Sequence, residues 1–401
     1  MPGFAPRQFL SIVSSRMMLL GALYPLRRAA RVVRATRPEL RGLRYGLAVL
    51  RELRAPAEPA RPPIESFSSL GAVRAVRGDG PGAAVLDCAG GALRVVALDE
   101  DLFQLRYRPD GVFEQPFSYS VAKGADAWEP VDVEVRETGE RVEIATALLR
   151  LVVDRATGEF SLLREDGQPL LRGGRGAAHS RSGQVVWQAT FPEETPFYGM
   201  GEKAFGLNLA GRELRLWNTD PAGYGRGRDP IYMSVPFALA LVEGQAVGIY
   251  VDNTYRGWAD LGTETPGSFT YRAAGGELRL YLTAGAPARV LEQYPALTGR
   301  LSLPPLWAFG LHQSRWSYYP QGRVLAIAGE FRRRELPCDV IHIDIHYMDG
   351  YRSFTWDRER FPALSEMTGL MREQGFKTLT MIDPGIKVDP RYRVYDEGVA
   401  R

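Results

Sequence analysis

The sequence is poor in the residues that cross-link a small fold or bind a metal. It contains only two cysteines, Cys88 and Cys338, and each lies beside a strand-like run. Two thiols in a chain of 401 residues do not make a disulfide framework, so we expect both to be buried and free. The four histidines show no metal-ligand spacing with cysteine or with one another, so no metal site is expected.

The chain also lacks an apolar run long enough to cross a membrane. The run from Phe9 to Tyr24 is too short and is interrupted by serines and Arg16. Residues 1–62 hold twelve Arg against three Glu, a net charge of +9, and we expect a disordered or helical extension. Three interpretations stay open: a basic helix on an anionic membrane surface, a targeting segment, or a translated upstream region without a selected role, which we favour. The stretch Ala55–Pro63 is rich in Pro and Ala and is typical of a linker.

The rest of the chain is mildly acidic. The total net charge is +3, so the residues after the extension carry −6, which is not typical of a nucleic-acid binder. The length of 401 residues favours two domains. We expect a cytoplasmic protein, and self-association into a homo-oligomer stays open.

The region 63–300 has no helix of ordinary length before Ala288 and reads as an all-β domain. Short alternating runs are separated by turn signals, which predicts a sandwich of antiparallel sheets. The residues around Ala156–Gly158 predict a hairpin. The predicted strands are Leu93–Leu98, Leu102–Tyr107, Val131–Arg136, Val142–Val153, Val185–Phe191, Phe237–Val242, Val247–Val251, Ser268–Arg272 and Glu277–Thr283.

The pattern changes in the region 301–401, where strands and helices alternate. This order implies right-handed crossovers and a parallel sheet. The predicted elements are a strand at Leu306–Leu311, a helix at Gly322–Arg334, a strand at Val340–Ile345, a helix at Ala363–Gln374 and a strand at Lys377–Ile382.

Polar and aromatic residues follow each of these three strands. Trp316 and Tyr318 come after the first strand, Asp344 lies at the end of the second, and Asp383 follows the third. Because parallel strands end at the same rim of a sheet, these side chains are expected to meet there. Aromatic rings that pack on a pyranose, beside carboxylates that accept bonds from its hydroxyls, indicate a sugar site.

Several long motifs occur in chain order. In the second region they are GLHQSRWSY (Gly310–Tyr318), DVIHIDIHYMDGYRSFTWD (Asp339–Asp357) and MIDPGIKVDPRY (Met381–Tyr392), and in the first they are FYGMGEKAFGL (Phe197–Leu207) and LWNTD (Leu216–Asp220). The motifs of the second region resemble the opening of the catalytic barrel of glycoside hydrolase family 31, the α-glucosidase and α-xylosidase family, and those of the first look like its β-sandwich signature. The resemblance implies a multidomain fold, namely a sandwich similar to galactose mutarotase followed by the first three strands of a (β/α)8 barrel.

The resemblance implies substrate-binding roles for five residues. Asp344 matches the acid that binds the hydroxyls of the non-reducing sugar, and Ile345 lines the same subsite. Trp316 matches an aromatic residue of that subsite, and Met381 an apolar one. Asp220 matches an acid that a sandwich loop inserts into the pocket. Arg315 and Asp383 are predicted to support the site from behind.

This sequence departs from the family pattern at two positions, with His346 and Ser353 where the family commonly has acids. Asp344 and His346 are two residues apart, so we expect them on one side of the strand, with the imidazole supporting the carboxylate. The implied retaining mechanism needs two carboxylates and no cofactor. Neither carboxylate is identified here, because the family's nucleophile motif W-x-D-M-N-E is absent and both groups are expected beyond Arg401.

Three functions are consistent with these observations. The first is a retaining α-glycosidase, represented by its N-terminal part, whose partner is an oligosaccharide, an α-glucoside or an α-xyloside. The second is a carbohydrate-binding remnant without catalysis, and the third is an inert gene fragment.

Overall fold

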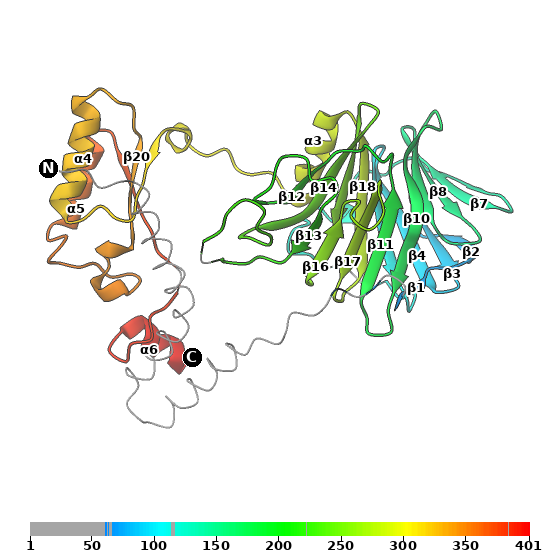
Figure 1. Cartoon of the computed structure of the whole chain (residues 1–401), viewed down its shortest axis with the longest axis horizontal. Coiled ribbons are helices and arrows are strands. Elements are labelled where there is room, and N and C mark those ends of the chain that lie inside the picture. The colour runs from blue at the N-terminus through cyan, green and yellow to red at the C-terminus, as the bar shows by residue number, and fades with distance from the viewer. Residues whose placement is uncertain (1–60, 62, 64–65, 114–116, 222, 384) are drawn as a thin grey trace, which may run out of the picture. The chain divides into compact units, whose positions relative to one another are not determined.

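A computed structural model describes residues 61, 63, 66–113, 117–221, 223–383 and 385–401. The chain divides into two compact units, Met1–Arg300 and Leu301–Arg401, which are drawn together in Figure 1. The predictions for the Arg-rich extension and the linker fall outside the described residues, apart from Arg61 and Pro63. Arg61 contacts the carboxylates of Glu213 and Glu264.

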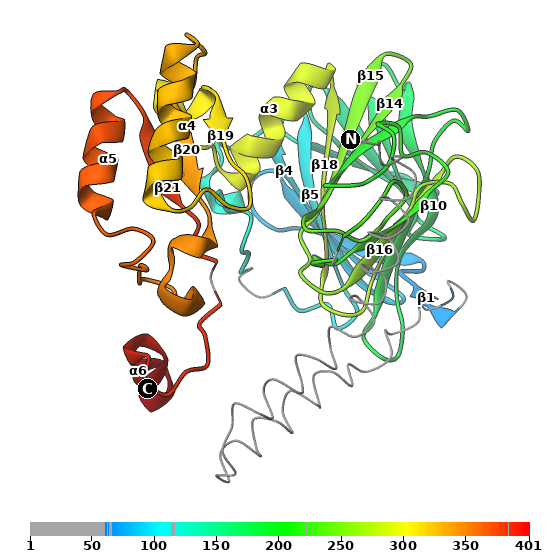
Figure 2. The ribbon, with the colours of Figure 1, turned by 60° about the vertical axis from the view of Figure 1, so that its left-hand side comes forward.

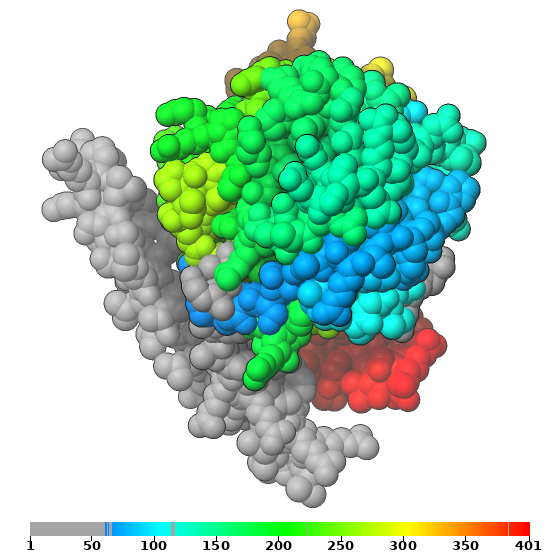
Figure 3. Space-filling model, turned by 90° about the vertical axis from the view of Figure 1, so that its right-hand side faces the viewer, coloured from blue at the N-terminus to red at the C-terminus, as the bar shows by residue number. Residues whose placement is uncertain are grey.

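The first unit contains two antiparallel sheets, which confirms the antiparallel prediction. The order in the larger sheet is β13-β16-β17-β11-β10-β9-β8-β7-β6, and β1 pairs with β10. Its strands are β1 (Ser68–Ser69), β6 (Glu134–Glu137), β7 (Arg141–Ala145), β8 (Leu149–Asp154), β9 (Phe160–Arg164), β10 (Pro169–His179), β11 (Val185–Thr190), β13 (Glu213–Leu216), β16 (Gly257–Asp260) and β17 (Ser268–Ala273). Because β1 pairs with β10, early and later chain segments adjoin, as the blue and green atoms show in Figure 3.

The second sheet of this unit has the order β12-β14-β15-β18-β5-β4-β3-β2. Its strands are β2 (Val73–Gly78), β3 (Ala83–Cys88), β4 (Gly91–Asp99), β5 (Leu102–Arg108), β12 (Phe197–Gly201), β14 (Ser234–Val242), β15 (Gln245–Val251) and β18 (Leu278–Gly285).

The core of the first unit lies between the two sheets. Phe103 and Leu105 of β5 join Trp187 of β11 in one buried cluster drawn from both sheets. Because side chains alternate along a strand, Gln104 and Arg106 of β5 lie on the opposite, outer face of the second sheet.

Helix α3 (Pro287–Thr298) covers part of that outer face, as Figure 2 shows. Its Val290 and Leu297 are buried against residues of the second sheet such as Phe237. A 3-10 turn, η2 (Ala125–Ala127), precedes it in this unit. Beyond the helix, part of the outer face carries polar side chains such as Gln104 and Arg106.

The predicted hairpin around Ala156–Gly158 is confirmed, because β8 pairs with β9 in antiparallel fashion. The single predicted strand Val142–Val153 is wrong, since it is two strands, β7 and β8. Thr146 breaks the run. Its backbone N–H donates to the carbonyl of Leu149 at 2.9 Å, and its hydroxyl accepts from the N–H of Leu149 at 3.0 Å. These bonds close a tight turn that the apolar pattern does not reveal.

The second unit is an alternating strand and helix structure with a parallel sheet in the order β19-β20-β21, as predicted. Among its described residues no closed barrel forms. Its elements are η3 (Leu306–Phe309), β19 (His312–Gln313), α4 (Gln321–Arg333), β20 (Val340–Ile343), η4 (Ile345–Tyr347), η5 (Asp349–Tyr351), α5 (Leu364–Glu373), β21 (Lys377–Thr380) and α6 (Arg393–Ala400). Val324, Met367 and Ile343 share its buried core.

The predicted strand at Leu306–Leu311 is wrong. This segment forms a 3-10 turn, η3, and the first strand begins later, at His312. Pro305 has a fixed φ of −64°, and its carbonyl accepts from the N–H of Ala308 at 2.9 Å, which starts the turn. The apolar run therefore follows the proline into a turn instead of extending.

Both cysteines are buried and unpaired, as predicted. Burial raises the pKa of the Cys88 thiol to about 12, with a smaller contribution from the charge of Asp87. A search of the described residues finds no helix whose length and apolar character would let it span a membrane.

Candidate functional site at the strand ends

The carboxyl ends of β20 and β21 lie next to each other. Ile343 is paired with Thr380, and the N–H of Met381 donates to the carbonyl of Ile343 at 3.0 Å. Asp344 and Met381 therefore leave the sheet from adjacent positions. The backbone of Met381 is held further by its carbonyl, which accepts from the hydroxyl of Tyr347 at 3.2 Å.

Asp344 is half-buried and caps the turn η4. One of its carboxylate oxygens accepts from the N–H of Ile345 at 2.7 Å, which fixes the side chain at the strand end. Ile345 itself is half-buried and packs against the core of the second unit. A carboxylate anchored by a backbone donor keeps further acceptor capacity for a ligand.

The expectation that Asp344 and His346 lie on one side of a strand is wrong. Strand β20 ends at Ile343; Asp344 caps the following 3-10 turn and His346 lies within it, where the two-residue period does not apply. The imidazole Nδ1 of His346 lies 2.7 Å from the hydroxyl oxygen of Ser317. This contact orients the ring toward the segment that follows β19.

His346 is the centre of an aromatic cluster, which we define as His346, Trp316, Tyr319 and Tyr351. The ring centre of His346 lies 5.6 Å from Trp316, 5.0 Å from Tyr319 and 5.5 Å from Tyr351. Trp316 is 74% exposed, and both tyrosines are exposed as well. Exposed rings gathered beside an anchored carboxylate offer apolar faces and a strong hydrogen-bond acceptor within one small area.

The two predicted supporting residues, Arg315 and Asp383, are both exposed. The guanidinium carbon of Arg315 lies 5.7 Å from the ring centre of Tyr318. Asp383 has a positive φ of 50°, in the segment that follows β21. Their supporting roles stay predictions.

Ser353 is a buried anchor for the segment that follows β21. It is 1% exposed, and its hydroxyl lies 3.4 Å from the carbonyl oxygens of Ile382 and Gly385. Its own carbonyl accepts from the hydroxyl of Tyr392. The residue at this departure from the family pattern therefore orders a loop.

Asp220 lies in the first unit, exposed, in the segment between β13 and β14. A buried ion pair closes the base of that segment. The amino group of Lys203 is 2.7 Å from the carboxylate of Asp229, which also accepts from the N–H of Arg215 at 2.5 Å. That Asp220 shares a pocket with Trp316 and Asp344 stays a prediction.

The sequence did not single out Tyr319 and Tyr351 or the ion pair between Arg352 and Asp389. The guanidinium of Arg352 lies 2.7 Å from Asp389 and ties the segment after β20 to the one after β21. A hydrogen bond from the backbone of Arg391, and then one from Arg352, lowers the pKa of Asp389. Tyr351, Arg352 and Asp389 lie inside the quoted motifs and Tyr319 directly follows one of them, and this position was the available signal.

A pair of histidines lies in the sheet itself. The Nδ1 atom of His312 on β19 lies 3.2 Å from Nε2 of His342 on β20. Burial, and then the neighbouring His312, lowers the pKa of His342. Among the described residues, no group of three or more His, Cys, Asp or Glu side chains is arranged to hold a metal ion.

Comparison with protein families gives two matches in chain order. Residues 92–260 match the glycosyl hydrolase 31 N-terminal galactose mutarotase-like domain, and residues 301–401 match the glycosyl hydrolases family 31 TIM-barrel domain. Together they cover more than half of the chain. The chain belongs to glycoside hydrolase family 31. The resemblance inferred from the motifs is therefore confirmed.

Individual relatives agree with this assignment. The chain is 38% identical over 315 residues to alpha-glucosidase 2 of Bacillus thermoamyloliquefaciens, covering 78% of this chain and 40% of that protein. It is 31% identical over 219 residues to an alpha-glucosidase of Saccharolobus solfataricus, covering 54% of this chain and 32% of that one. Among solved structures, a Flavobacterium johnsoniae GH31 dextranase complexed with glucose superposes with a TM-score of 0.75 at 27% identity, covering 82% of this chain and 40% of that chain. The chain thus spans well under half the length of these relatives.

Proposed function

We propose that this chain is the N-terminal part of a retaining α-glycosidase of the α-glucosidase type, acting on terminal α-linked sugars of oligosaccharides. The observation that carries the proposal is the aromatic cluster beside the anchored carboxylate of Asp344. In this proposal the carboxylate accepts bonds from the hydroxyls of the terminal sugar, and Trp316 packs on its apolar face. Ile345 and Met381 line the same subsite, and Asp220 completes it from the sandwich.

The proposal also covers domain organisation. We assign residues 63–300 to the N-terminal sandwich and residues 301–401 to the first three strands of a (β/α)8 barrel. The two family matches, to residues 92–260 and 301–401 in chain order, support this assignment. The nucleophile and the acid/base are placed beyond Arg401, and they would stand about 5–5.5 Å apart for a retaining reaction.

The test uses the polypeptide encoded by the whole reading frame that contains this chain. Its hydrolysis of 4-nitrophenyl α-glucoside and α-xyloside is measured for the wild type, for Asp344→Asn and for the control Asp349→Asn. Asp349 lies five residues further on, and its side chain is 63% exposed. We expect Asp344→Asn to lower kcat/KM at least about 100-fold, because a charge-assisted bond to the sugar is lost, and the control to stay near the wild type.

Equal kcat/KM for Asp344→Asn and the wild type would remove Asp344 from the site. Sugar binding without hydrolysis of either substrate would support the carbohydrate-binding remnant instead. A protein that neither binds nor hydrolyses these sugars would contradict both functions.

A further inference from the structure

The polar part of the outer face of the second sheet contains a cavity of about 140 Å³. This is roughly ten times the space that one water molecule needs. The cavity is lined by side chains from three places: residues 117–119, the loop after β15, and the start of β18. All belong to one compact unit.

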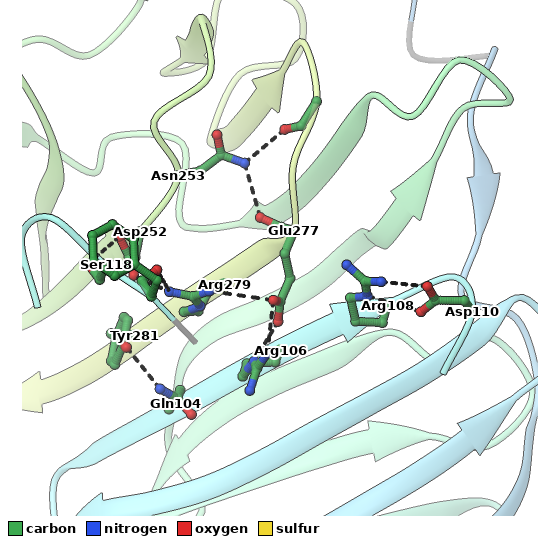
Figure 4. Close-up of polar contacts among 12 residues, drawn as sticks. Gln104, Arg106, Arg108, Asp110, Ser118, Asp252, Asn253, Glu277, Arg279 and Tyr281 are labelled. Carbon is green, nitrogen blue, oxygen red and sulfur yellow. Dashed lines mark hydrogen bonds and ion pairs between the residues drawn. The ribbon is translucent and has the colours of Figure 1, made fainter. Parts of the chain in front are cut away.

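The floor of the cavity is a buried network of charges, shown in Figure 4. Arg106 of β5 and Arg279 of β18 are directly paired positions on adjacent strands, where two like charges would repel. Glu277 separates them: it accepts from Arg106 at 2.5 and 2.9 Å and from Arg279 at 3.5 Å. Asp252 accepts from Arg279 at 2.5 Å.

Arg106 pairs with Glu277 without itself lining the cavity, so two cations and two anions balance in this network. A charged ligand would therefore gain no net attraction from it and would lose its own hydration. Polar hydrogen-bonding capacity nevertheless remains. Asp252 accepts one bond from Arg279 and one from the hydroxyl of Ser118 at 2.9 Å, about half of what a carboxylate can accept. The floor suits a neutral ligand with several hydroxyl groups.

Arg279 supplies an independent sign of a missing partner. It is 8% exposed and lines the cavity, yet its Nε donor is buried and has no hydrogen-bond partner among the described residues. A buried unpaired donor costs about 1–3 kcal/mol in a folded protein. The guanidinium of Arg279 therefore has unused donor capacity beside the cavity, which a ligand hydroxyl can use once the side chain shifts, because the Nε atom itself is covered.

Aromatic rings surround the opening of the cavity. Phe117 and Tyr119 are 73% and 83% exposed, and their ring centres lie 4.8 Å apart in an edge-to-face arrangement. Tyr255 also lines the cavity and is 55% exposed. Its ring is held against a backbone without side chains, because a Cβ atom at Gly276 would come within 2.9 Å of it.

We propose that this cavity is a second, non-catalytic sugar-binding site on the sandwich, which takes a neutral pyranose unit of an oligosaccharide. The rings of Tyr119 and Tyr255 pack on the apolar faces of the sugar. Asp252 and Arg279 bind its hydroxyls. The site belongs wholly to the first unit, so it does not depend on the catalytic function proposed above. It would hold a long substrate chain near the enzyme and raise its effective concentration.

The test is a titration of the full chain with isomaltotriose and with maltotriose, followed by calorimetry. Trp316→Ala removes the strand-end site. Tyr119→Ala and Tyr255→Ala are combined to remove the two rings of the sandwich site. Both tyrosines are exposed, so their replacement should not unfold the protein. Leu148→Ala, an exposed apolar residue in the turn between β7 and β8, is the control. We expect Trp316→Ala to retain sugar binding at the sandwich.

In the Trp316→Ala background, the two tyrosine substitutions together should raise the remaining dissociation constant at least about tenfold, and Leu148→Ala should leave it unchanged. Unchanged affinity after both tyrosine substitutions would overturn the proposal. So would complete loss of binding in Trp316→Ala alone. If the strand-end site does not bind sugar, Trp316→Ala will instead bind the sugar with the same affinity and stoichiometry as the wild type.

Discussion

Replacing Lys203 with methionine is expected to loosen the segment that carries Asp220. The amino group of Lys203 lies 2.7 Å from Asp229, and the two side chains are only 4% and 9% exposed. Lys203 also donates to the carbonyl of Arg215 on β13 at 3.0 Å, so it joins the two ends of the segment. Methionine keeps most of the side-chain volume but removes the charge and both bonds.

The magnitude follows from the burial of the partner. Removing one member of a buried ion pair typically costs about 3–5 kcal/mol, because the other charge stays buried. Asp229 keeps one strong bond, since it accepts from the N–H of Arg215 at 2.5 Å. We therefore expect the lower end, a loss of about 3 kcal/mol in the free energy of unfolding of the first unit.

The assay is urea unfolding, combined with tryptic cleavage at Arg226 and Arg228 within the segment. The control is Arg136→Ala, which removes a pair with Glu134 at a similar distance, 2.5 Å, but on the exposed surface. It should leave the unfolding midpoint unchanged. The double variant Lys203→Met/Asp229→Asn should recover part of the loss, because no unpaired charge stays buried. If Lys203→Met shifts the midpoint no more than Arg136→Ala, the assigned role of the buried pair is incorrect.

Three further predictions concern single groups. With a pKa near 12, Cys88 should resist iodoacetamide at about pH 8 in the native protein and react after unfolding in urea; rapid labelling of the native thiol would contradict its burial. The pKa of His342 lies below its ordinary 6.5 in the folded state, so as the pH falls below that value the unfolded chain binds the proton first and the free energy of unfolding decreases. His342→Gln should make this decrease smaller in thermal melts recorded at falling pH. An equal decrease in the variant would show that His342 does not cause it. In Gly248→Ala the new methyl group would come within 2.7 Å of Val290 on α3, so the free energy of unfolding should decrease by about 1–3 kcal/mol. An unchanged Tm would contradict this, because it would show that α3 can move away without loss of stability.

Much of the fold could be predicted because its signals are local. The β-branched run Val340–Ile343 gave a buried strand at the right place, and the hairpin of β8 and β9 follows from the turn residues between them. Two errors had a common cause. The run Val142–Val153 and the run Leu306–Leu311 are apolar along their length, but Thr146 and Pro305 hydrogen-bond with backbone three residues away and form turns.

The candidate site was predictable only in part. Asp344 and Trp316 occur at strand ends, and the position of a strand end can be inferred from the sequence. The surroundings of His346 could not be predicted, because they depend on the residue at which β20 ends. If the strand were one residue longer, the His346 ring would point in another direction. The outer-face cavity escaped sequence reasoning altogether, since Arg106, Asp252 and Arg279 come from separate strands and loops that meet only in the folded sheet.

The most direct test of the account is a calorimetric titration of isomaltose into the chain in which Tyr119 and Tyr255 are already replaced by alanine, so that heat from the sandwich is removed. The strand-end site then predicts saturable binding that Trp316→Ala weakens at least about tenfold and that Trp356→Ala, an exposed indole outside the aromatic cluster, leaves intact. Binding that survives Trp316→Ala unchanged would contradict the claim that the ends of these strands receive a sugar.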